Sequence, residues 1–163
     1  MDDPATALGT VVEEGRGALP FHLIHGESLV ACAAWALGDA GVTAVDLGTQ
    51  WEGIVDSGGP FVLHDALCPM TPAVFIAQCV ARCVATDAIV VGTDAAGALL
   101  SPVVLPSSVV AAIDRLPVLD FPQLVDLLEG RFAVERVPAP ASAARVATSE
   151  DVAALEALTT PES

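Results

Sequence analysis

The 163-residue chain contains no lysine, so its fixed positive charge comes from six arginines alone. These face 21 acidic residues, which gives a formal net charge of −15 at pH 7. Binding to nucleic acids and to anionic membranes depends on clustered Lys and Arg side chains. The charge balance therefore argues against both kinds of partner, and it limits how many phosphate groups the protein can bind.

Long apolar runs and paired cysteines are also missing. The longest uninterrupted apolar run covers residues 29–37, far short of the roughly 20 residues that a membrane-spanning helix needs. The start of the chain, Met1-Asp2-Asp3-Pro4, is acidic where a signal peptide is basic, so we expect a cytoplasmic protein. The four cysteines show no Cys-x-x-Cys spacing, and neither a zinc site nor a redox pair is predicted.

Apolar residues are abundant, at 53% of the chain, although aromatic residues are few. We expect a single domain over residues 1–163, with residues 1–6 as a flexible tail. Predicted strands alternate with predicted helices, which favours an α/β fold. So much apolar content indicates either that some apolar surface is covered by association, or that a GC-rich genome encodes Ala and Val often.

The stretch that follows residues 61–63 is the most informative part of the sequence. These three apolar residues predict a buried strand, and His64 and Asp65 come directly after it. In open α/β sheets, ligands bind outside the carboxyl ends of the strands. We therefore expect Asp65 to lie at the mouth of a site.

Two motifs resemble one enzyme family. The run His64-Asp65-Ala66-Leu67-Cys68-Pro69 resembles the His-Asp-Ala-Ala-Arg-Pro signature of 2-C-methyl-D-erythritol 4-phosphate cytidylyltransferases, which belong to the non-mevalonate isoprenoid pathway. Residues 145–158, RVATSEDVAALEAL, resemble that family's Lys-Ile-Thr-x-Pro-Glu-Asp-Leu-x-x-Ala-Glu ending. The two motifs keep the family's order and rough separation, and the resemblance covers residues 8–158.

The resemblance implies a fold and a set of site residues. The fold is a three-layer α/β/α sandwich with a mixed, mainly parallel, Rossmann-like sheet. Asp65 matches the family's aspartate, which coordinates Mg²⁺, and Arg145 matches a lysine that stabilises charge on the reacting phosphates. Gly15-Arg16-Gly17 resembles a remnant of the family's glycine-rich loop, whose backbone N–H groups approach the nucleotide phosphates.

The sequence also departs from the family pattern. Glu13 and Glu14 put carboxylates where a triphosphate should lie, and Cys68 replaces the phosphate-binding arginine of the signature. The family's Gly-Gly-x-x-Arg-x-x-Ser segment, which helps to hold the nucleotide, is missing. We therefore predict a catalytically degenerate member that acts as an interaction or regulatory subunit.

Two other functions stay open. An active enzyme would transfer CMP from CTP to 2-C-methyl-D-erythritol 4-phosphate or a related sugar or alditol phosphate, with Mg²⁺. A third possibility is a binder of a smaller ligand in the cleft around Asp65. Trp51, in the predicted loop over residues 48–60, either stacks on a base, seals a partner surface, or packs over the sheet.

Association is predicted from residues 99–113. This apolar stretch lies where the family extends an arm that exchanges between two subunits. We expect it to be an oligomerisation arm that forms a homodimer or a heterodimer with a paralogue.

Overall fold

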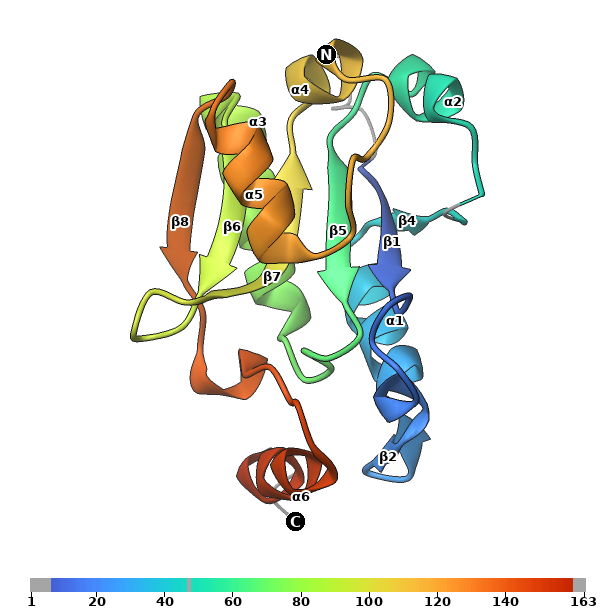
Figure 1. The fold of residues 1–163 in the computed structure, drawn as a ribbon, viewed down its shortest axis with the longest axis vertical. Helices are drawn as coiled ribbons and strands as arrows, with labels where there is room; N and C mark the ends of the chain where they lie inside the picture. Colours follow the sequence, from blue (N-terminus) through green and yellow to red (C-terminus); the bar gives the residue numbers. More distant parts are fainter. Residues whose placement is uncertain (1–6, 47, 160–163) are drawn as a thin grey trace.

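A six-stranded mixed sheet forms the centre of the protein, which we describe from a computed structural model over residues 7–46 and 48–159 (Figure 1). Its strand order is β4-β1-β5-β7-β6-β8. All neighbouring strands run parallel except β7, which is antiparallel to both β5 and β6. The strands are β1 (Leu8–Val12), β4 (Thr43–Ala44), β5 (Phe61–Asp65), β6 (Ile89–Thr93), β7 (Leu99–Leu105) and β8 (Val134–Pro138).

Helices cover both faces of this sheet (Figure 1). One layer consists of α2 (Trp51–Asp56), α4 (Ser107–Ala112) and α5 (Phe121–Glu129), and the other consists of α1 (Leu29–Asp39) and α3 (Ala73–Thr86). The expected three-layer α/β fold with a mixed, mainly parallel sheet is confirmed. No helix of the described residues combines the length and the apolar character needed to cross a membrane.

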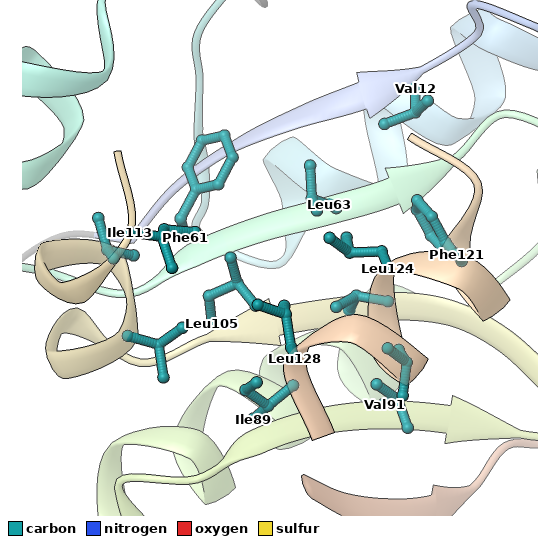
Figure 2. Close-up of a cluster of buried hydrophobic side chains, with 14 of the residues drawn as sticks. Val12, Phe61, Leu63, Ile89, Val91, Leu105, Ile113, Phe121, Leu124 and Leu128 are labelled. Atoms are coloured by element: carbon teal, nitrogen blue, oxygen red, sulfur yellow. The ribbon is translucent and has the colours of Figure 1, made fainter. Parts of the chain in front are cut away.

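Successive residues of a strand point to opposite faces of the sheet, so each helix layer packs on its own hydrophobic cluster. Phe61 and Leu63 of β5 pack with α2, α4 and α5, whereas Val62 between them packs with α1 and α3. Figure 2 shows the first of these clusters, with Leu124 and Leu128 of α5 lying over the sheet. All five residues of β5 are buried, as the central strand of a sheet covered on both faces requires.

A smaller group of elements lies beyond the carboxyl ends of the parallel strands (Figure 1). It contains a short 3-10 helix (Leu19–Phe21), the hairpin of β2 (Leu23–Ile24) and β3 (Glu27–Ser28), a second 3-10 helix (Ala141–Ala143) and α6 (Ser149–Leu158). Val152 and Leu155 of α6 pack against Ile24 and Leu29. Thr148 and Asp151 form a capping box that fixes the start of α6.

Several sequence expectations differ from the structure. The stretch 48–60 contains the helix α2 rather than a single loop. Leu47 and the expected tail over residues 1–6 lie outside the described residues. Trp51 packs over the sheet, since its ring meets Phe61 edge-on with centroids 5.6 Å apart and its N–H donates to backbone carbonyls of residues 110 and 113.

Residues 99–113, expected to form an arm, contain β7 and α4. β7 lies between β5 and β6, and its residues from Leu100 to Leu105 are buried. The apolar side chains that led to the expectation are therefore covered within the chain itself. Dimerisation with a copy or a paralogue stays a prediction.

The close approach of β6 and β7 at Gly92 can be tested. A Cβ atom at this position would lie 2.5 Å from the Ser101 carbonyl oxygen and 3.0 Å from the Phe75 ring. We expect Gly92→Ala to lower the free energy of unfolding by about 2 kcal/mol, because backbone rather than a mobile side chain must shift. Gly38→Ala on α1 is the control: no atom outside the backbone of its own helix lies within 4 Å of its Cβ position, and we expect a gain of about 0.5 kcal/mol. Urea unfolding measures both, and equal effects would contradict the prediction.

Candidate functional site

Asp65 lies at the carboxyl end of β5 with no solvent-exposed surface. Its position follows from the sheet, because β5 pairs in parallel with β1 and Val12 is the partner of Asp65 in the register. The loop that leaves β1 therefore begins beside the carboxylate. The structure confirms that Asp65 is at the strand end, but the side chain is buried rather than open to a cleft.

Two arginines converge on this carboxylate. Arg16 approaches with Nε 3.4 Å from Oδ1 and Nη2 3.2 Å from Oδ2, and Arg145 donates from Nη1 to Oδ2. The backbone N–H of Leu67 donates to Oδ1 at 2.9 Å. Each carboxylate oxygen thus accepts two hydrogen bonds, which uses the roughly four acceptor positions that a carboxylate has.

Further contacts hold the two guanidinium groups in place. Arg16 also donates to the carbonyl oxygens of Leu119 and Glu14, each at 2.9 Å, and Arg145 donates to the Leu100 carbonyl at 3.2 Å. Both groups face the ring of Phe121, at 5.5 and 5.9 Å from its centroid, within the range of a cation–π interaction. Figure 2 shows Phe121 beside the end of β5. Together the two arginines and Asp65 carry a net charge of +1.

Ser101 of β7 supports the same strand end from the other side. Its Oγ accepts the backbone N–H of Asp65 at 3.0 Å and lies 2.6 Å from Nδ1 of His64. Both side chains are fully buried, and burial lowers the pKa of His64 to about 4. His64 is therefore neutral at pH 7. Its Nε2 is the one buried side-chain polar atom of the described residues that has no hydrogen-bond partner.

The residues around Asp65 do not form a site for Mg²⁺. This ion requires an octahedral shell of oxygen ligands, and the Asp65 oxygens already accept hydrogen bonds from cationic donors. Within residues 7–46 and 48–159, no three His, Cys, Asp or Glu side chains gather closely enough to hold a metal ion. A divalent cation could reach Asp65 only by displacing an arginine.

The expected phosphate loop is present only in part. Gly15 and Gly17 both adopt left-handed backbone angles, with φ of +77° and +67°, and they turn the chain so that Arg16 points at Asp65. The segment after them is a 3-10 helix and a hairpin, and the first α-helix begins only at Leu29. The turn therefore lacks the helix N-terminus that normally adds to phosphate binding. Glu14 is exposed beside it.

Cys68 lies where the signature has arginine, and it contributes packing. Its side chain is fully buried with Leu100 and Ala143. Burial raises the pKa of the Cys68 thiol to about 12, although the nearby Arg145 acts in the opposite direction. The thiol is therefore neutral at pH 7 and cannot replace a cation.

The structure thus brings together Asp65, Arg16 and Arg145, which the sequence analysis singled out from three distant segments. It adds Ser101 and Phe121, which the sequence did not indicate. Ser101 sits inside a strand and Phe121 at the start of an apolar helix, and neither belongs to a recognisable motif. Only the antiparallel placement of β7 and the packing of α5 reveal them.

The fold of the chain can be compared with the folds of known proteins. No protein-family model matches the chain, and comparison with curated protein sequences gives no match. The overall α/β fold is instead similar to that of solved nucleotidyltransferase-like structures. The resemblance seen in the sequence is confirmed at the level of the fold.

Three solved structures show this likeness over nearly the whole chain. A 4-diphosphocytidyl-2C-methyl-D-erythritol synthase from Anaerococcus prevotii is 12% identical, with a TM-score of 0.67 and 96% of each chain covered. The 2-C-methyl-D-erythritol 4-phosphate cytidylyltransferase of Thermus thermophilus is 16% identical, with a TM-score of 0.64 over 94% of this chain and 98% of that one. Rv0371c of Mycobacterium tuberculosis, solved as a manganese complex, is 13% identical, with a TM-score of 0.65 over 95% and 100%.

Removing the charge of Asp65 tests the buried ion cluster. We expect Asp65→Asn to lower the free energy of unfolding by about 3 kcal/mol, because two largely buried guanidinium groups lose their counter-charge. The matched control is Glu129→Gln, which breaks the exposed ion pair with Arg136 and should change stability little. Denaturant titration at pH 7 measures both variants. Similar effects of the two substitutions would mean that the Asp65 cluster contributes no more than a surface pair.

The buried His64 predicts a pH dependence of stability. Its pKa is about 4 in the folded protein and about 6.5 when unfolded. Between these values the unfolded chain binds a proton that the folded chain does not, so stability falls as the pH is lowered from 6.5 to 4, by roughly 3 kcal/mol in total. Above pH 6.5 this contribution is fully present.

The experiment compares the wild-type protein with His64→Asn across this pH range. The variant keeps a polar atom near Ser101 but cannot titrate, so its stability curve should be flatter. His22→Asn, at an exposed position, should keep the wild-type slope. Parallel curves for wild type and His64→Asn would show that His64 is not the titrating group.

Proposed function

We propose that this chain is a cytoplasmic, catalytically degenerate relative of the cytidylyltransferases that works as an interaction or regulatory subunit, either with a second copy or with a paralogue. The observation that carries the proposal is the state of Asp65. In the related enzymes this position is expected to hold the metal ion, whereas here its oxygens accept hydrogen bonds from two arginines and a backbone N–H.

The charges around the site support the same conclusion. Nucleotidyl transfer depends mainly on positioning and on neutralising the phosphates. This chain contains no lysine, the Cys68 thiol is neutral, and Glu14 adds a negative charge at the turn. Each lost transition-state contact costs roughly 3 kcal/mol, so several losses together leave negligible turnover.

The alternative function is an active enzyme that transfers CMP from CTP to 2-C-methyl-D-erythritol 4-phosphate or a similar phosphate, with Mg²⁺. One observation favours it: Arg16 and Arg145 carry one more positive charge than Asp65 neutralises, and the Arg145 side chain is 28% exposed. A phosphate group could therefore contact Arg145. The Mg²⁺ ion would still need Asp65 to release an arginine.

Calorimetric titration of CTP with Mg²⁺ distinguishes the two functions. We expect no binding heat and no thermal stabilisation at millimolar CTP, because the site offers a single excess positive charge to a triphosphate. A coupled pyrophosphate assay with 2-C-methyl-D-erythritol 4-phosphate should likewise show no turnover above the rate without protein.

The control variant is Arg145→Gln. If wild-type protein binds CTP at micromolar strength and Arg145→Gln does not, the nucleotide occupies this site and the degenerate function is refuted. Binding that survives the substitution but supports no turnover would leave the proposal standing and place the nucleotide elsewhere on the protein.

A further inference from the structure

A hollow of about 420 Å³ lies on the α1 and α3 side of the protein, away from Asp65. Cys32 and Trp35 of α1 line it, together with Met70 from the segment before α3 and Ala73, the first residue of α3. The hairpin residue Ile24 and the end of α6 close one end. We call this feature the α1 groove.

Trp35 is the most unusual residue of the α1 groove. Its side chain is 56% exposed, although α1 buries Leu29, Ala33 and Leu37 against the body of the protein. Val74, the next residue after the groove residue Ala73, is 65% exposed. Tryptophan and methionine are enriched in the cores of protein interfaces, and tryptophan is prominent among residues whose truncation abolishes binding.

The α1 groove is acidic as well as apolar. Glu27 and Asp39 both line it, and neither Lys nor Arg does. The Glu27 carboxylate is close enough to Cys32 to help burial raise the pKa of that thiol. Four of the six arginines of the chain form ion pairs within the protein. The other two, Arg115 and Arg131, line a different hollow beside α4 and α5.

This charge distribution decides between possible occupants. A second copy would bring a further charge of −15 and has no unpaired arginine on the same surface. An anionic membrane is repelled for the same reason. A partner with positive charges beside apolar residues would be attracted to Glu27 and Asp39 while it covers Trp35.

We propose that the α1 groove binds an amphipathic helix of a partner protein, which places large apolar residues against Trp35 and Met70 and its Lys or Arg side chains beside Glu27 and Asp39. A helix that lays one apolar face into a groove is a common mode of recognition. The inference rests on the proposed function as an interaction subunit, and it names the surface and the chemistry of the partner.

A synthetic helical peptide of leucine and lysine tests the groove directly. Its leucines are spaced to form one face, and its fluorescence anisotropy is followed as the full-length chain is added. We expect saturable binding, and we expect Trp35→Ala to weaken it roughly tenfold or more. The double variant Glu27→Gln, Asp39→Asn should weaken binding and reduce its dependence on salt.

Two controls make the test specific. Leu127→Ala removes an apolar side chain that is 54% exposed on α5, in the opposite helix layer, and should leave binding unchanged. A peptide with glutamate in place of lysine should not bind. Equal binding by wild type and Trp35→Ala would overturn the proposal, since the peptide would then be attracted by the general negative charge alone.

Sedimentation equilibrium tests the competing occupant. A dimer of the wild-type chain that dissociates in Trp35→Ala would assign the α1 groove to a second copy and overturn the proposal, whereas a monomer in both supports it. If the peptide does not bind and the protein shows no cytidylyl transfer, only the proposal for the α1 groove is refuted. Measured transfer would refute the proposed function, so the two failures can be told apart.

Discussion

A single buried carboxylate constrains much of this structure. Asp65 has no exposed surface, and a carboxylate in that position is stable only if cations and N–H donors replace the water it has lost. Arg16 supplies one cation from the loop after β1, and Arg145 supplies the other from the segment before α6. The ion pairs with Asp65 thus tie both segments to the ends of the strands.

The antiparallel strand β7 completes this arrangement. It places Ser101 next to β5, where one hydroxyl contacts both the Asp65 backbone and the His64 ring. It also brings the Leu100 carbonyl to Arg145. The support for the buried charge is thus built into the sheet, and the donors around Asp65 are already engaged within the protein.

The fold could largely be predicted from the sequence because it depends on local patterns. The apolar run over residues 61–63 indicated the buried strand β5, and the alternation of predicted strands and helices indicated the α/β class. Motif matching also singled out Asp65, Arg16 and Arg145, which the structure brings together. The position of β7 was not predictable in this way, because an apolar strand at the centre of a sheet and an apolar arm have the same composition.

The partners of the Asp65 carboxylate could not be predicted from the sequence, for a different reason. Whether Asp65 faces a metal ion or two arginines depends on which side chains reach it across 49 and 80 residues of sequence, and no local pattern records such distances. Ser101 and Phe121 were missed for the same reason. The departures from the family pattern at Glu14 and Cys68 can be read from the sequence alone, since one adds a carboxylate and the other removes a cation near the strand end.

The separation of Arg145 from Asp65 along the chain also determines the order in which the members of the ion cluster are synthesised. Protein synthesis proceeds from the N-terminus, so Arg16 and Asp65 both exist before the 80 residues that lead to Arg145 have been added. Contacts between remote segments also form late, because a long loop must be closed first. During synthesis Asp65 is therefore made well before Arg145, the second of its two cationic partners. The fully paired carboxylate is possible only after the C-terminal segment that carries Arg145 has been made.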